Sequence, residues 1–293
     1  MRRGLLIYNP AAGMRRHTKR LPAILAALRE GGIATEVVAT ERRGQATELA
    51  RAAIGAADVV FAYGGDGTVR EVAVGLYGSE TPLGVLPGGT TNVVAIAFGL
   101  SSDPIEAARQ HCRLEPRRID VGLCAGHPFL MQASSGVEAY LMARLEPGLK
   151  AWLGFAGALL QGAFVFLRYR YPQLRLRVDG EPTSATGAMV CNIPEVAGPY
   201  RMVPSGRFDD RQLELLLFRG TSRAVVASFC LDLYRGAHAG RADVEIRKVR
   251  EVVFEGPAEA YVQIDGDVVL DPHPVTVRLA ERQLMALVAS PRP

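Results

Sequence analysis

The residues best suited to chemistry lie in three glycine-containing turns. Each turn follows a short apolar run and could bind phosphate. They comprise Asn9–Gly13, Gly64–Thr68 and Pro87–Asn92, after the runs Leu5–Tyr8, Asp58–Tyr63 and Leu83–Leu86. Glycine lets backbone N–H groups approach an anion closely, and a helix that begins at such a turn adds a favourable dipole. Ligands bind at the carboxyl ends of strands in an open parallel sheet, so the turns predict one phosphate-binding edge.

The turns match neither of two common nucleotide-binding motifs. The chain has no GxxxxGK[ST] sequence, which excludes a P-loop, and no GxGxxG at its first helix, which argues against a Rossmann dinucleotide site. No lysine lies near the glycine turns. Phosphate charge must therefore be met by backbone amides, arginine, a metal ion and the hydroxyl groups of Thr68, Thr90 and Thr91.

The elements that must position these turns alternate between strand and helix over the first 130 residues. Besides the three apolar runs, a strand is expected at Ala34–Ala39, and helices are expected at Lys19–Glu30, Gly44–Ala53, Thr68–Leu76 and Thr91–Phe98. Such alternation is typical of a parallel sheet with helices on both faces.

After about residue 120 the pattern changes to short strands separated by turns such as Asp179-Gly180 and Asp265-Gly266. Strands are expected at Phe129–Ser134, Gln173–Val178, Ala188–Ile193, Leu213–Phe218, Asp243–Arg247, Glu251–Phe254, Ala260–Ile264 and Val275–Leu279, and helices at Ala139–Leu167 and Arg223–Tyr234. We therefore predict an α/β domain with a parallel sheet at residues 1–127. A mostly antiparallel β domain should follow at residues 128–293, and its last strand can return to the first domain.

Composition and charge exclude several classes of protein. Hydrophobic residues make up 48% and charged residues 22%, which is typical of a globular protein. The net charge of +4 is spread along the chain, which argues against nucleic acid as a partner. The uncharged stretch Ala151–Leu167 is shorter than the about 20 apolar residues of a transmembrane span, so none is expected. We expect a cytoplasmic protein, with contact to the anionic inner face of the membrane as an option.

Five segments resemble the diacylglycerol kinase catalytic-domain family, which includes bacterial lipid kinases and is related to sphingosine and ceramide kinases. In the family's order they are Asn9–Gly13, Gly64–Thr68 followed by Glu71, Gly89–Asn92, Ile119–Gly122 and Ile264–Asp267. The resemblance implies a fold like that of NAD kinases and diacylglycerol kinases. It also implies ATP-dependent transfer of the γ-phosphate, with Mg²⁺, to a hydroxyl of a lipid such as diacylglycerol or a sphingoid-type lipid at a membrane surface.

The resemblance also implies roles for individual residues. Nucleotide contacts are implied at Asn9, Pro10, Ala11, Ala12, Gly13, Thr40, Gly64, Gly65, Asp66, Gly67, Thr68, Glu71, Thr90 and Asn92. The implied base, which takes the proton from the acceptor hydroxyl, is Asp265, with Asp267 and Asp66 as the other catalytic acids. The dipeptide Asp265-Gly266 is also typical of a hairpin turn, and a turn can present a carboxylate.

Metal binding is implied at two places. Asp66 and Asp120 are the expected ligands, directly or through water, of the Mg²⁺ that accompanies ATP. A structural Mg²⁺ is implied at Asp210 with the carbonyl groups of Arg207 and Gln212.

Three residues depart from the family's pattern. Val93 stands where many members carry an acid, Asp267 stands where glutamate is usual, and Arg211 replaces a glycine and brings a positive charge beside the structural metal. These departures keep open a non-catalytic nucleotide- or lipid-binding protein on the same scaffold.

Two further questions stay open at this point. An NAD kinase-like enzyme would share the Gly64–Thr68 motif but requires an Asn-Glu pair, whereas Asn92 and Asn192 are each followed by an apolar residue. The stretch Ala151–Leu167 fits an acyl groove or an ordinary core helix. The oligomeric state is also open, a homodimer included.

Overall fold

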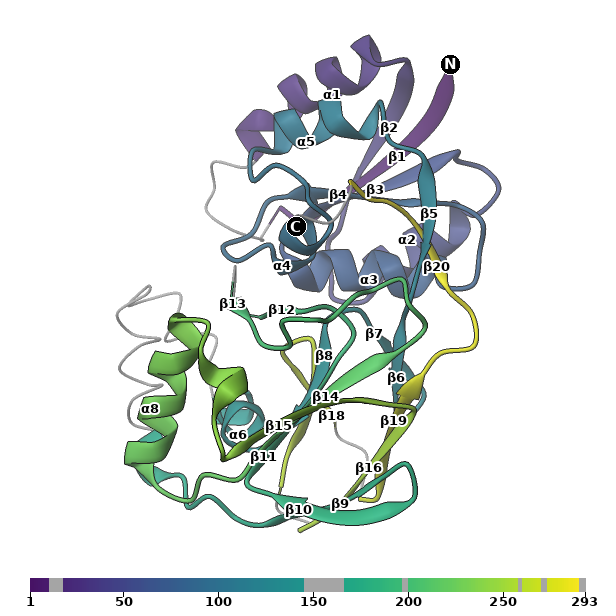
Figure 1. The fold of residues 1–293 in the computed structure, drawn as a ribbon. Coiled ribbons are helices and arrows are strands. Elements are labelled where there is room, and N and C mark those ends of the chain that lie inside the picture. The colour runs from purple at the N-terminus through teal and green to yellow at the C-terminus, as the bar shows by residue number, and fades with distance from the viewer. Residues whose placement is uncertain (11–17, 145–165, 197–199, 258–259, 270–272, 290–293) are drawn as a thin grey trace.

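Figure 1 shows two layered regions in the computed structural model, an α/β region above a β-rich region. The structure describes residues 1–10, 18–144, 166–196, 200–257, 260–269 and 273–289. The stretch Ala151–Leu167 lies almost entirely outside these ranges. None of the helices within them has both the length and the apolar character needed to cross a bilayer.

The first sheet has the order β2-β1-β3-β4-β20-β5 and is parallel from β2 to β20. Its strands are β1 (Arg2–Tyr8), β2 (Ile33–Ala39), β3 (Val59–Gly64), β4 (Leu83–Pro87), β5 (Pro116–Ile119) and β20 (Leu284–Leu287). Every residue of β3 and β4 is buried, as expected for strands that helices cover on both faces. β20 comes from the end of the chain and pairs with β4 on one side and, antiparallel, with β5 on the other.

Helices cover both faces of this sheet. They are α1 (Leu21–Glu30), α2 (Gln45–Ala52), α3 (Asp66–Leu76), α4 (Val93–Ala97) and α5 (Pro104–His111), with a 3₁₀ turn at Thr18–Arg20. α1 and α5 pack on one face, and α2, α3 and α4 pack on the other (Figure 1). The predicted α/β architecture is confirmed. The sequence pattern missed α5, which begins where the Asp103 carboxylate accepts the N–H groups of Ile105 and Glu106.

The second region is a sandwich of two six-stranded sheets. One sheet, in the order β10-β9-β16-β19-β6-β7, contains β6 (Gly122–Cys124), β7 (His127–Phe129), β9 (Leu174–Val178), β10 (Glu181–Ala185), β16 (Glu251–Gly256) and β19 (Val275–Leu279). The other, in the order β15-β14-β11-β8-β17-β18, contains β8 (Gln132–Ser135), β11 (Gly187–Cys191), β14 (Leu213–Phe218), β15 (Val244–Val249), β17 (Val262–Ile264) and β18 (Asp267–Val269). In the described ranges each pairing within these sheets is antiparallel, as predicted.

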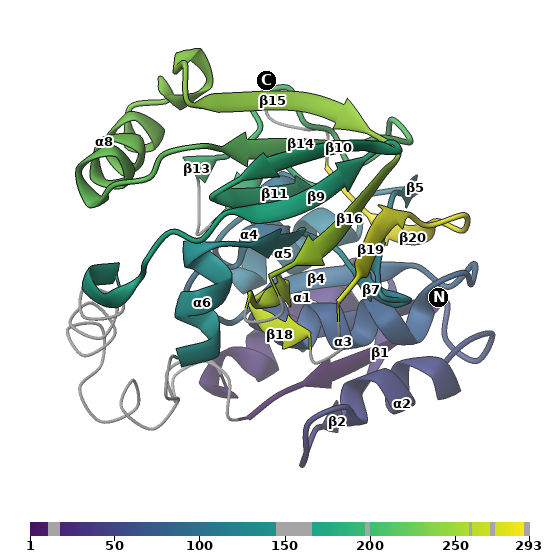
Figure 2. The ribbon, with the colours of Figure 1, turned by 90° about the horizontal axis from the view of Figure 1, so that it is seen from below.

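Alternation of apolar and polar residues explains how the sandwich packs. Leu174, Leu176 and Val178 of β9 are buried between the sheets, whereas Arg175 and Arg177 between them are exposed. Helices α6 (Val137–Arg144) and α8 (Arg223–Tyr234) lie at one side of the sandwich, as Figure 2 shows. A short ribbon of β12 (Glu195–Val196) and β13 (Tyr200–Arg201) and a 3₁₀ turn at His238–Gly240 complete the described elements.

The predicted strand at Phe129–Ser134 is wrong in one respect, because it is interrupted. β7 ends at Phe129 and β8 begins at Gln132. The intervening N–H groups of Leu130 and Met131 donate to the carboxylate of Asp265. A backbone donor used by a side chain cannot pair in a strand ladder, so a distant carboxylate sets the start of β8.

Burial of His111 predicts that the stability of the fold depends on pH. His111 is fully buried on α5, its Nε2 donates to the carbonyl of Val85 at 2.8 Å, and burial lowers its pKa to about 4. The unfolded chain takes up this proton near pH 6.5, whereas the folded chain does not. Stability should therefore fall as the pH drops from about 6.5 to about 4, by up to about 3 kcal/mol from this residue.

Urea unfolding at pH 7 and pH 4.5 would measure this effect. His111→Gln keeps an N–H donor for Val85 but cannot titrate, so its unfolding free energy should depend less on pH than that of the wild type. An equal pH dependence in the two proteins would contradict the assignment.

Candidate functional site

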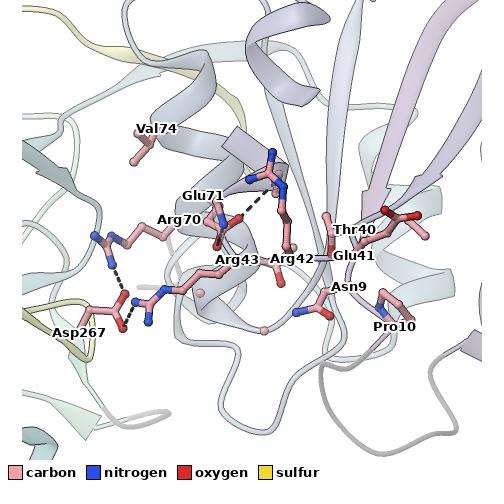
Figure 3. A pocket seen from close by; sticks show the side chains of 16 residues that line it. Asn9, Pro10, Thr40, Glu41, Arg42, Arg43, Arg70, Glu71, Val74 and Asp267 are labelled. Atoms are coloured by element: carbon pink, nitrogen blue, oxygen red, sulfur yellow. Dashed lines mark hydrogen bonds and ion pairs between the residues drawn. The ribbon is translucent and has the colours of Figure 1, made fainter. Parts of the chain in front are cut away.

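A cavity of about 870 Å³ lies at the carboxyl edge of the first sheet. It is lined by Asn9, Pro10, Ala39, Thr40, Glu41, Arg42, Arg43, Gly44, Ala46, Gly65, Gly67, Thr68, Arg70, Glu71, Val74 and Asp267. These residues come from the turn after β1, the segment after β2, the first turns of α3 and the β17–β18 hairpin (Figure 3). The cavity therefore joins the two regions of the chain.

Close backbone approach brings the glycine turns together at this edge. The N–H of Asn9 donates to the carbonyl of Tyr63 at 3.3 Å, which ties the ends of β1 and β3. A Cβ atom on Gly89 would lie only 2.6 Å from the Cα of Gly65. Glycine is thus required where the second and third turns meet.

The second turn opens α3 and forms part of the cavity wall. Gly65 is the N-cap residue of α3, and Gly65, Gly67 and Thr68 line the cavity. The first N–H groups of a helix have no partners within the helix, and the helix dipole favours an anion beside them. This wall of the cavity is suited to a phosphate group.

Two polar side chains fix the third turn. Asp66 accepts hydrogen bonds from the hydroxyl of Thr91 at 3.0 Å and from the N–H of Val94 at 3.1 Å. Asn92 closes the turn on Gly89, accepting from its N–H at 2.8 Å and donating to its carbonyl at 3.0 Å. Asp66 thereby holds the third turn against the second, and Asn92 fixes the shape of the third turn.

Glu71 fixes the segment between β2 and α2. Its carboxylate accepts the N–H groups of Gly44 at 3.0 Å and Ala46 at 3.3 Å, and its carbonyl accepts the hydroxyl of Thr47 at 2.8 Å. Because Glu71 belongs to α3, the segment that carries Arg43 is attached to that helix.

Three arginines that sequence reasoning did not single out line the cavity, namely Arg42, Arg43 and Arg70. Asp267 forms ion pairs with Arg43, at 2.7 Å, and with Arg70. Arg70 lies four residues after Asp66 and therefore on the same face of α3. This spacing was the one feature of the sequence that could have indicated Arg70 as a cavity residue. Nothing local marks Arg43.

Asp265 occupies the first position of the β17–β18 turn, with φ of 51°. Its Oδ2 accepts from the N–H of Leu130 at 2.8 Å, and its Oδ1 accepts from Met131 at 2.8 Å and Gln132 at 3.0 Å. Burial raises the pKa of this carboxyl, whereas the three N–H donors and the nearby Arg70 guanidinium lower it. A carboxylate with a raised pKa is better suited to take up a proton near neutral pH.

The cavity brings together many of the residues that the sequence singled out, but not all. Those that line it are Asn9, Pro10, Thr40, Gly65, Gly67, Thr68, Glu71 and Asp267. Those that lie in the neighbouring turns without lining it are Gly64, Asp66, Thr90, Asn92 and Asp265. Ala11, Ala12 and Gly13 lie outside the described residues.

Asp120 lies outside the cavity lining, fully buried between the two regions. Its carboxylate accepts from the N–H of Arg211 at 2.6 Å, from the Arg211 guanidinium at 3.2 Å and from the side-chain amide of Gln283 at 3.0 Å. The guanidinium compensates the buried negative charge, as a metal ion would elsewhere.

The loop of the second implied metal site is held by a lysine in this structure. The carboxylate of Asp210 accepts from the N–H of Gln212 at 3.1 Å and from the ammonium of Lys248 at 3.0 Å. The Arg207 guanidinium pairs with Asp209 at 2.9 Å. In the part of the chain that the structure describes, no three His, Cys, Asp or Glu side chains are grouped to hold a metal. Metal binding at Asp210 therefore stays a prediction.

Comparison with known proteins agrees with this arrangement. Residues 3–124 match the diacylglycerol kinase catalytic domain, and residues 133–288 match the YegS C-terminal NAD kinase beta sandwich-like domain. A diacylglycerol kinase of Bacillus subtilis (strain 168) is 28% identical over 273 residues, which covers 91% of this chain and 90% of that protein. A diacylglycerol kinase of Staphylococcus saprophyticus is 26% identical and covers 91% and 89%.

The fold is also that of a solved structure. A crystal structure of a candidate diacylglycerol kinase from Bacillus anthracis str. Sterne superposes with a TM-score of 0.83 at 22% identity, covering 99% of this chain and 96% of that one. The two matched domains together account for the α/β region, the sandwich and the cavity between them. The chain therefore belongs to the diacylglycerol kinase catalytic-domain family.

Proposed function

We propose that this chain is an ATP-dependent lipid kinase, which transfers the γ-phosphate of ATP to a hydroxyl of a lipid such as diacylglycerol or a sphingoid-type lipid. The observation that carries the proposal is the cavity, in which the start of α3 faces the hairpin that contains Asp265. Family membership supports phosphoryl transfer, and the names of the relatives support a diacylglycerol-type acceptor. Residues 1–127 would bind the nucleotide and residues 128–293 the acceptor.

In this proposal the chain contributes positioning and charge compensation, which phosphoryl transfer requires above all. The N–H groups at the start of α3 and the hydroxyl of Thr68 bind phosphate oxygens, while Asn9 and Thr40 contact the nucleotide at the other end of the cavity. Mg²⁺ would neutralise charge on the phosphates, and the partly exposed carboxylate of Asp66 offers the oxygen ligands that this cation prefers.

Asp265 would act as the base in this reaction. It would take the proton of the acceptor hydroxyl as the oxygen forms its bond to the phosphorus, and ADP would leave. The raised pKa of this carboxyl supports the role, because proton transfer is most effective when the pKa of the base approaches the working pH.

A second cavity supports a lipid acceptor. It measures about 490 Å³, and its lining includes Tyr140, Tyr169, Tyr261, Arg168 and Arg170. Tyrosine rings offer an apolar surface with a polar tip, and arginine attracts anionic head groups. Tyr261 immediately precedes β17, which leads to Asp265. The cavity and the proposed base are therefore four residue steps apart, about 13 Å along a strand.

A transfer assay tests the proposed function directly. Full-length protein incubated with γ-labelled ATP, Mg²⁺ and vesicles that contain diacylglycerol or a sphingoid base should give a labelled product soluble in organic solvent. Label in NADP after addition of NAD would instead show an NAD kinase. No transfer to lipid or NAD, with ATP still bound, would contradict a kinase and favour a binding protein.

Substitution of Gly67 should separate nucleotide binding from folding. A Cβ atom on Gly67 meets no atom within 4 Å in the described structure, and alanine is favoured over glycine inside a helix by about 1 kcal/mol. The melting temperature of Gly67→Ala should therefore equal or exceed that of the wild type. Since the residue lines the cavity, the added methyl group should weaken ATP binding at least about tenfold in calorimetry.

Gly240→Ala is the matched control, because its Cβ also meets open space but lies in a turn of the second region. It should leave ATP affinity unchanged. Unchanged affinity in Gly67→Ala as well would place the nucleotide elsewhere.

Asp265→Asn should abolish transfer while preserving nucleotide binding. Asparagine keeps an oxygen for the N–H groups of Met131 and Gln132 but cannot accept a proton, so the rate should fall at least about 100-fold. Melting temperature and ATP affinity provide the folding controls. In the wild type, the acidic limb of kcat/KM should lie above the ordinary aspartate value, because burial raises the pKa of this carboxyl. Full activity in the variant would exclude Asp265 as the base.

A further inference from the structure

The ion pairs of Asp267 lie at one end of the larger cavity, opposite Asn9 and Pro10 (Figure 3). Its Oδ1 lies 2.7 Å from Nη2 of Arg43, and its Oδ2 contacts Nη1 of Arg70. Arg43 precedes α2, Arg70 lies on α3, and Asp267 begins β18. One carboxylate thus connects the sandwich to the α/β region across the cavity.

These contacts contribute little to the stability of the fold. The side chain of Arg43 is 79% exposed, and exposed ion pairs stabilise proteins only slightly. Arg70 is only 20% exposed, and its Nε is buried without a hydrogen-bond partner in the described residues. A buried donor without a partner is destabilising, so this guanidinium has hydrogen-bonding capacity that the described fold leaves unused.

The backbone segments that carry the two arginines are tied to each other. Arg70 is followed directly by Glu71, whose carboxylate binds the N–H groups of Gly44 and Ala46 and so anchors the segment that carries Arg43. Two guanidinium groups converging on one carboxylate match the geometry of a phosphate group, which accepts paired N–H donors in the same way.

The location of the pair also fits the reaction. Both arginines contact Asp267, which lies two residues after Asp265 in the β17–β18 hairpin, and Arg70 itself lies on α3. An anion bound by the two arginines would therefore lie between the start of α3 and Asp265. In-line transfer requires the terminal phosphate at this place, between the rest of the nucleotide and the acceptor hydroxyl.

We propose that Arg43 and Arg70 bind the terminal phosphate of the nucleotide, and that Asp267 is a positioning residue that holds both guanidinium groups until that phosphate replaces it. The inference rests on the proposed function, because it requires a nucleoside triphosphate in the cavity. Phosphate oxygens take over the donors that the Asp267 carboxylate occupies in the free protein. Asp267 therefore both orders the arginines and competes with the ligand.

The affinities for two nucleotides test whether Arg43 and Arg70 bind the terminal phosphate. Calorimetry would measure the binding of ADP and of the β,γ-imido analogue of ATP to the full chain. Arg43→Met and Arg70→Met should each weaken binding of the analogue at least about tenfold and leave ADP unchanged, because ADP lacks the terminal phosphate. Arg43 is largely exposed, so its variant should fold even if Arg70→Met does not. Asp267→Asn keeps an oxygen that can accept a hydrogen bond from the arginines but removes the competing charge, so it should strengthen binding of the analogue alone.

Arg51→Met is the matched control, because Arg51 is exposed on α2 and does not line the cavity. It should change neither affinity. Equal losses for ADP and the analogue in Arg43→Met, or no loss for either, would overturn the proposal. A wild-type protein that binds neither nucleotide would instead contradict the proposed function itself.

Discussion

The carboxylate of Asp265 accepts three backbone N–H groups, and the geometry of the site depends on this interaction. The donors are the N–H groups of Leu130, Met131 and Gln132, at the point where β7 gives way to β8. An unpaired buried N–H is costly, so this carboxylate fixes both the start of β8 and the position of the β17–β18 turn. Asp267, two residues further on, is thereby placed at the cavity.

Basic side chains compensate negative charge at Asp120 and Asp210, where the family's pattern implies metal ions, and at Asp267, where it implies none. Arg211 contacts the buried carboxylate of Asp120, and Lys248 contacts Asp210. At the cavity, Arg43 and Arg70 contact Asp267. A guanidinium brings its charge without a coordination shell, and its planar donors suit carboxylate and phosphate alike. The chain thus places fixed cations beside acids that could otherwise bind metal.

Features that depend on local sequence pattern were predicted correctly. Features that depend on contacts between distant segments were missed. The strands and glycine turns were predictable because burial and backbone geometry set their residues locally. The break at Leu130 and the contact of Arg70 were not predictable, because both depend on the β17–β18 hairpin. In the sequence, Asp267 of this hairpin is 197 residues from Arg70. The resemblance grouped Asp120 with Asp66, whereas the structure brings Asp120 into contact with Arg211.

The relation between Asp267 and the two arginines shows how a short acidic side chain makes contact across the cavity. The turn fixes the backbone of Asp267, so its carboxylate reaches no further than an aspartate side chain extends. Arg43 and Arg70 close the distance from the opposite wall, because their long side chains reach the carboxylate from α3 and from the segment that Glu71 anchors. The hydrogen bonds of Glu71 therefore stabilise the charge arrangement at the cavity as well as the start of α2.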